Sequence, residues 1–152
     1  MLLWARPTEV GWVPSDQIGD VIKAFGYFLL RGLKAADLTL DQLVEDLANN
    51  QCWLGVAFET EPFRPLGIWV TDLRYDEDSE LNFATIYGLS GERLPAWTQD
   101  FERIVTDFAL ANKCKSVRFF GRAAYRSLIE DLDIIGKSED GRALLFEKKI
   151  AA

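Results

Sequence analysis

Three apolar segments in the middle of the chain, followed by one long amphipathic stretch, restrict the possible folds more than any other feature. Residues 52–58, 66–73 and 80–89 have the patterns of β-strands, and the short polar links between them predict an antiparallel meander. An apolar stripe at helical spacing over 95–111 then leads to another strand-like segment at 116–120. A helix that connects two strands of one sheet makes those strands parallel. We therefore predict a mixed sheet with a crossover helix.

The remaining segments place helices before the meander and a hairpin after it. Ser15 is a suitable cap for a first helix, and Thr39 begins a capping box that predicts a second one. An apolar face over 123–132 predicts a last helix, and an Asp-Gly turn near the C-terminus predicts a closing hairpin. With an extended N-terminal segment, the predicted order is β-α-α-β-β-β-α-β-α-β-β. We predict an α/β (α+β mixed sheet) fold in which residues 1–152 form a single domain.

The composition is that of an acidic globular protein. The 152 residues carry a net charge of −7, and five Trp and ten Phe supply apolar volume for a core. Nucleic acids and anionic membranes attract clustered Lys and Arg, so we expect neither as a partner. The N-terminus lacks the pattern of a signal peptide, and no apolar run approaches the roughly 20 residues that span a bilayer. We therefore expect a cytoplasmic-type protein.

The absence of histidine excludes whole classes of site. Without His, the chain's own side chains cannot form a Ser-His or Cys-His catalytic pair or a His-ligated metal site. Cys52 and Cys114 lie in or beside apolar segments, far apart in the sequence, which predicts buried free thiols. The acidic residues 76–78 lack the spacing of a calcium loop and are interpreted as a solvated hairpin tip. We expect no metal site.

The predicted order of elements resembles the GNAT superfamily of N-acetyltransferases over nearly the whole chain. In the C-terminal half, 94–97 (LPAW) opens a helix, 109–114 (ALANKC) follows it, and 120–128 (FGRAAYRSL) completes a longer motif. These stretches are similar to small phage-encoded GNAT-like proteins, a subgroup that includes podovirus internal virion protein A and phage acetyltransferases. In this sequence Asn112-Lys113 replaces the usual Gly of the motif, and Tyr125 replaces its Trp.

The resemblance implies an acyl-CoA site between the third central strand and the long helix. GNAT enzymes hold the CoA pyrophosphate there on backbone N–H groups within a glycine-containing signature. Neither Gly88 nor Gly91 gives the signature spacing, and Pro95 removes one N–H donor. Glu92 adds a negative charge, which Arg93 could offset. We therefore predict an altered loop. If acyl-CoA is bound, the residues that hold it are Leu89, Ser90, Gly91, Glu92 and Arg93.

The resemblance also implies catalytic residues, for which the sequence offers few candidates. GNAT enzymes often use a Tyr of the last helix to protonate the leaving thiolate, and Tyr125 is the one Tyr in that segment. Its other interpretation is packing at the junction of strand and helix. For a carboxylate base, the third central strand offers only Glu80 at its start. Glu59 is a candidate base acting through water, and its other interpretation is an exposed charge at a strand end.

Three functional hypotheses follow from these observations. The first is a non-catalytic bacteriophage structural or assembly protein in the virion or the host cytoplasm, with protein partners or self-association and no cofactor. The second is an acyl-CoA-dependent N-acetyltransferase with a degenerate pyrophosphate loop, which would bind acetyl-CoA. The third is a phage-encoded adaptor or inhibitor that binds a host protein. If Phe63 and Trp69 are exposed together, they form an apolar patch for a protein partner. The altered loop ranks the first hypothesis above the second.

Overall fold

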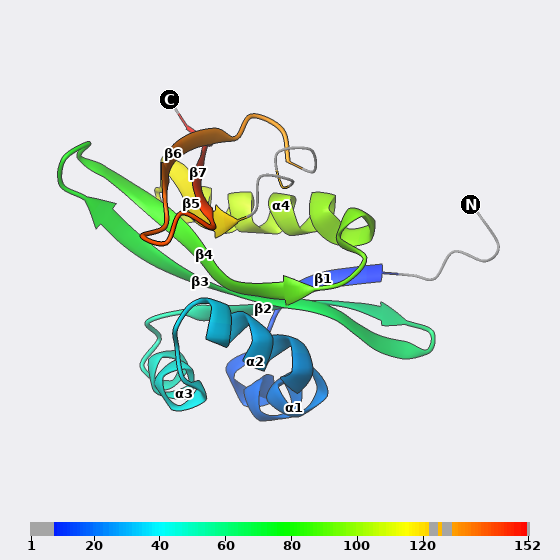
Figure 1. Cartoon of the computed structure of the whole chain (residues 1–152). Helices are drawn as coiled ribbons and strands as arrows, with labels where there is room; N and C mark the ends of the chain where they lie inside the picture. The colour runs from blue at the N-terminus through cyan, green and yellow to red at the C-terminus, as the bar shows by residue number, and fades with distance from the viewer. Residues whose placement is uncertain (1–7, 122–124, 126–128, 152) are drawn as a thin grey trace.

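The fold is built on one sheet of seven strands in the spatial order β1-β2-β3-β4-β5-β7-β6 (Figure 1). The computed structural model describes residues 8–121, 125 and 129–151. The strands are β1 Thr8–Trp12, β2 Trp53–Thr60, β3 Phe63–Asp76, β4 Leu81–Gly91, β5 Ser116–Gly121, β6 Asp133–Lys137 and β7 Leu144–Lys149.

Helices cover both faces of this sheet. The short helices α1, α2 and α3 lie on one face, and the long helix α4 lies on the other (Figure 1). The helices are η1 Ser15–Gln17, which is a 3-10 turn, α1 Ile18–Ala24, α2 Gly26–Ala35, α3 Leu40–Ala48 and α4 Leu94–Ala111.

The pairing of the strands confirms the predicted mixed sheet. Strands β1 to β4 pair antiparallel in sequence order, β4 and β5 pair parallel, and β7 lies antiparallel between β5 and β6. The parallel pair is the one connected by α4, as a crossover helix requires. The predicted capping box is also confirmed, because the Thr39 hydroxyl accepts from the Gln42 N–H while the Gln42 side chain accepts from the Thr39 N–H.

The prediction of one first helix capped by Ser15 is wrong. Pro14 occupies the cap position of η1 and no side chain caps it, so Ser15 is inside the turn. The helical segment then breaks at Phe25, whose φ of −108° and ψ of 13° end α1 before Gly26 starts α2. Glycine has low helix propensity, and the break lets the Phe25 side chain enter the core with 3 % of its surface exposed.

The loop over 60–65 and the last helix are the other two predicted segments whose bounds are affected. The predicted loop over 60–65 is shorter, because β2 runs to Thr60, a cis Glu61–Pro62 bond makes the turn, and β3 resumes at Phe63. The predicted last helix at 123–132 falls largely on residues 122–124 and 126–128, which lie outside the described residues.

The sheet separates two apolar cores. On the α4 side, Trp69, Trp97 and Phe101 pack together; on the other side, helix residues such as Leu29 pack on sheet residues such as Ile68. Trp69 is 0 % exposed, so the predicted surface patch of Phe63 with Trp69 does not form. The two cysteines are buried free thiols, as predicted, and burial raises the pKa of both.

Candidate active site

The central feature of the candidate site is a split between β4 and β5. The two strands pair in parallel only from Phe83 to Ile86 on β4, opposite Ser116 to Phe119 on β5. Beyond that point β4 continues to Gly91, whereas the end of β5 pairs only with β7. Within the described part of the chain, the last five residues of β4 therefore have no partner strand on the β5 side.

A bulge in β4 lies directly beside the split. Val70 of β3 pairs with Tyr87 and Ile68 pairs with Ser90, so two residues of β4 stand opposite one residue of β3. Gly88, in the bulge, has a φ of +63°, a conformation that favours glycine. Helix α2 closes against this point, because a Cβ on Gly32 would lie 2.2 Å from the Gly88 carbonyl oxygen.

The turn from β4 into α4 is held by internal hydrogen bonds. The Glu92 N–H donates to the Leu66 carbonyl at 2.8 Å, and the Trp97 indole N–H donates to the Glu92 carbonyl at 2.9 Å. Arg93 occupies the N-cap position of α4 with a φ of +55° and without a side-chain cap, and its carbonyl accepts from the Ala96 N–H at 2.9 Å. The Glu92 N–H of the predicted pyrophosphate loop and the Ala96 N–H of the first turn of α4 are thus used inside the protein, and Pro95 has none.

Charges around this turn are paired differently from the prediction. Arg93 does not offset Glu92; its guanidinium is 2.7 Å from the Glu59 carboxylate. Glu92 instead pairs with Arg64 at 2.6 Å. On the α2 side, Arg31 donates to the Ser90 hydroxyl at 3.0 Å and to the Gly91 carbonyl at 3.3 Å. The Glu92 charge is thereby neutralised, and Arg31 adds a cation beside the turn.

Glu59 is not an exposed charge at a strand end. It is 1 % exposed, and Arg93 reaches over it from the start of α4. The guanidinium supplies the opposite charge that a buried carboxylate requires. Since β2 lies two strands away from β4, Glu59 is not at the split.

Tyr125 lies against the end of β5 that borders the split. A Cβ on Gly121 would be 2.4 Å from Cδ2 of Tyr125, so the ring covers the glycine closely. Its ring centroid is also 6.3 Å from that of Phe119. These contacts agree with a packing role, and they also place the residue beside the split.

A polar group on β3 and on the paired part of β4, close to where the split begins, did not emerge from the sequence patterns. Asp72 of β3 accepts from the hydroxyl of Thr85 on β4 and from both Nε and Nη2 of Arg74 at 3.0 to 3.2 Å. Burial raises the pKa of the neighbouring Tyr87 well above its usual range, with smaller effects of Cys52 and Asp72. One signal was available, since Asp72 is a charged residue inside an otherwise apolar segment.

Two further properties bear on the class of site. In the described residues, no three acidic or cysteine side chains gather closely enough to hold a metal ion. No helix of the same residues is long and apolar enough to cross a membrane.

Comparison with known proteins identifies the fold. No protein-family model and no curated protein matches this sequence. FeeM, an N-acyl amino acid synthase from uncultured soil microbes, superposes with a TM-score of 0.68 at 8 % identity, covering 96 % of this chain and 92 % of FeeM. A structure described as a bacterial toxin gives 0.65 at 14 % identity, with the same coverages. A GNAT-family acetyltransferase from Staphylococcus aureus Mu50 gives 0.60 at 10 % identity over 95 % and 99 % of the chains. The chain therefore has a GNAT-like fold, as its order of elements predicted, and identities this low show the fold alone.

Proposed function

We propose that this protein is a GNAT-type N-acyltransferase that takes its acyl group from a coenzyme A thioester. The observation that carries the proposal is the split between β4 and β5 beside the Gly88 bulge. Among the described residues, it leaves the end of β4 without a partner strand on the β5 side, in the middle of a sheet where backbone N–H and C=O groups normally have partners. The amide groups of a pantetheine arm are complementary to an unpaired strand edge. A module used only for packing has no need of this opening.

The nucleotide and diphosphate end of coenzyme A fits this site less well than its pantetheine arm does. Backbone groups of Leu89 to Gly91 would bind the arm, and the start of α4 with Arg93 would face the diphosphate. Pro95 and the internal hydrogen bonds of the turn reduce the number of free donors. The pairing of Glu92 with Arg64 removes the repulsion that the sequence predicted. We therefore expect measurable binding that depends less on the nucleotide than on the thioester arm.

Two side chains are candidates for moving protons: Tyr125 lies against the end of β5 beside the split, and Asp72 lies on β3, where it accepts a hydrogen bond from Thr85 just before the split begins. In the reaction an amine nitrogen attacks the thioester carbonyl, a C–N bond forms, and the C–S bond breaks to release a thiolate. Asp72 would accept the proton lost by the amine, directly or through water, and Tyr125 would give a proton to the thiolate. Glu59 is buried under Arg93 away from the split, and we propose a structural role for it.

Titration calorimetry with acetyl-CoA, a longer acyl-CoA and free CoA tests the donor. Release of CoA thiol in the presence of a panel of amines tests the reaction. We expect Tyr125→Phe to retain donor binding and to lose about 100-fold or more in kcat, the range typical of a general acid. Tyr75→Phe, on an exposed tyrosine in β3, is the matched control.

The absence of both binding and thiol release would overturn the proposal. It would favour the non-catalytic phage virion or assembly role, which stays a prediction from the motif resemblance, as does the host-protein adaptor. An unchanged kcat in Tyr125→Phe would remove Tyr125 from the mechanism and leave its ring as packing on Gly121.

A further inference from the structure

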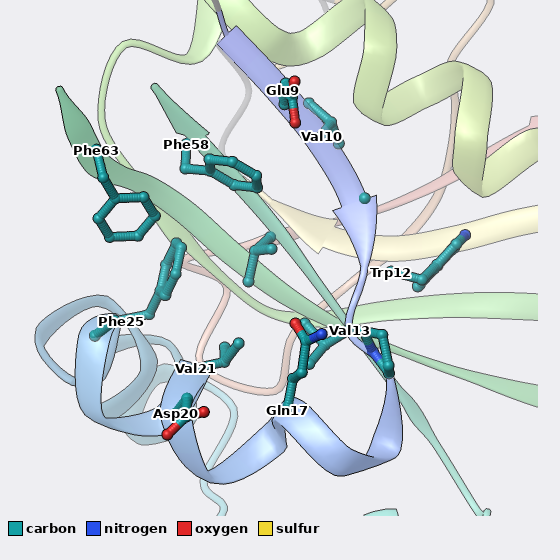
Figure 2. A pocket seen from close by; sticks show the side chains of 14 residues that line it. Glu9, Val10, Trp12, Val13, Gln17, Asp20, Val21, Phe25, Phe58 and Phe63 are labelled. Carbon is teal, nitrogen blue, oxygen red and sulfur yellow. The ribbon is translucent and has the colours of Figure 1, made fainter. Parts of the chain in front are cut away.

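A cavity of about 350 Å³ lies on the sheet face that carries α1 to α3, away from the split (Figure 2). It is bounded by β1, by the segment from Val13 into α1, and by the adjoining ends of β2 and β3. This volume is at the lower end of the range for small-ligand sites, which is roughly 300–1,000 Å³. Its apolar lining includes Val10, Val13, Val21, Phe25, Val56, Phe58 and Phe63.

Gly11 creates much of this space. It pairs with Val56 across β1 and β2, and its missing side chain would point to the same face as that of Val56. A Cβ built on Gly11 would meet no atom within 4 Å. Its backbone has no positive φ, so the glycine is not required by the conformation of the strand. The hollow therefore exists because this strand position carries no side chain.

Aromatic rings form one wall of the cavity. Phe63 packs edge to face on Phe25 with ring centroids 6.0 Å apart, and its centroid is 5.7 Å from that of Phe58 (Figure 2). Phe63 is nevertheless 54 % exposed, so an apolar ring remains open to solvent beside the cavity. The faces of such rings carry partial negative charge and attract cations.

The polar groups of the lining are acidic. Glu9 contributes from β1 and Asp20 from α1 on the opposite side of the cavity, both as exposed residues, and Gln17 adds a neutral amide (Figure 2). None of the 14 lining residues is Lys or Arg. Neither carboxylate makes an ion pair with any other residue that the structure describes. The cavity thus combines an apolar interior, an aromatic wall and two unneutralised negative charges.

We infer that this cavity is a binding site for a small apolar amine in its ammonium form. The hydrocarbon part occupies the hollow beside Gly11 and contacts Val56 and Phe58. The ammonium group lies at the open rim of the cavity, in the negative potential of Glu9 and Asp20, and the aromatic wall adds a cation–π contribution. The site is separate from the proposed acyl-transfer site, because three strand spacings of about 4.8 Å place β1 roughly 14 Å from β4.

The test compares three probes of nearly equal size at low ionic strength: 2-phenylethylamine, neutral 2-phenylethanol and anionic 3-phenylpropanoate. Chemical-shift titration of the backbone amides of β1 and α1 gives both the location and the dissociation constant. We expect the wild-type protein to bind the amine about tenfold or more tightly than the alcohol, and not to bind the anion. The double variant Glu9→Gln/Asp20→Asn should bind amine and alcohol equally.

Gly11→Val tests the location. The valine side chain fills the hollow, suits a strand, and meets no clash at its Cβ, so the fold should persist while amine binding is lost. Gly19→Ala is the matched control, because it adds a Cβ in open space outside the cavity lining. The inference is overturned if amine and alcohol bind wild type alike, if none of the probes shifts β1, or if Gly11→Val binds the amine as wild type does. Acetyl-CoA binding should be unchanged in Gly11→Val, so the outcome is independent of the proposed acyl transfer.

Discussion

On the α4 side of the sheet, Trp69 and Trp97 stack with ring centroids 6.4 Å apart, and the rings fill the space above two glycines. A Cβ on Gly55 would be 2.2 Å from Trp69, and a Cβ on Gly67 would be 2.5 Å from Trp97. On the opposite face, a Cβ on Gly11 would meet nothing within 4 Å. At these strand positions, glycine thus allows close packing on the α4 face and leaves a cavity on the α1–α3 face. The first face has no room for an added side-chain atom at Gly55 or Gly67, and the second has room for one at Gly11.

Removing one large ring from each face should give the largest difference in the free energy of unfolding between the two faces. Trp69→Ala should lower the free energy of unfolding by about 3–5 kcal/mol, because it empties a fully buried site surrounded by other rings. Phe63→Ala, on the opposite face, should cost about 1 kcal/mol or less because the ring is already half exposed. Urea unfolding followed by far-UV circular dichroism measures both. Equal losses would contradict the contrast between the faces.

Adding one methyl group to each face should also affect the stability of the two faces differently. Gly67→Ala should cost about 1–3 kcal/mol through overpacking against the Trp97 ring. Gly11→Ala should change stability by less than about 1 kcal/mol and in the stabilising direction, since it restricts the unfolded chain without a clash. Thermal unfolding at a fixed pH compares the two variants. A destabilised Gly11→Ala would show that the hollow is closed in solution.

Local patterns were sufficient to predict most of the fold. The capping box at Thr39 depends on residues three positions apart, and the parallel pairing of β4 with β5 follows from the helical spacing over 95–111. The break at Phe25 was missed because the apolar residues from Ile18 to Leu29 keep the spacing of one continuous helix. Apolar periodicity indicates which face of a helix is buried, and it does not indicate where one helix ends and the next begins.

The sequence located the turn between β4 and α4, and it did not predict the ion pairs around that turn. The stretch from Leu89 to Arg93 forms the last residues of β4 and the turn into α4, and its role in binding acyl-CoA stays a prediction. The partners of its charges depend on the register of strands far apart in sequence: Glu59 reaches Arg93 across 34 residues, and Arg64 reaches Glu92 across 28. The hollow at Gly11 likewise depends on which side chains surround the glycine in the folded chain, and sequence spacing does not predict these neighbours.

A smaller effect concerns the start of α3. The two faces also differ in their helices, because α4 has 18 residues and α3 has nine. A short helix depends more on its ends, so Thr39→Ala should cost about 1 kcal/mol by removing the capping box. Ser15→Ala is the matched control and should have almost no effect, since that hydroxyl caps nothing. Urea unfolding measures both, and a large effect of Ser15→Ala would contradict the observed start of η1.

The smallest expected effect lies at the end of the α1–α3 face that no helix covers, where β3 and β4 extend beyond α3 (Figure 1). There the Arg118 guanidinium, 3.0 Å away, lowers the pKa of Asp76, with smaller effects of Ser79 and Asp78. Because the folded state lowers this pKa, the stabilisation is present at neutral pH and is lost as the pH falls through the folded pKa. Asp76→Asn should therefore lower the Tm at pH 7, and its difference from wild type should shrink toward pH 2.5.

Asp78→Asn, on the same tip and without an ion pair among the described residues, should show no such trend. A difference that stays constant with pH would mean that Arg118 is held by Glu147 alone, and that the exposed end of this face adds nothing to stability through charge.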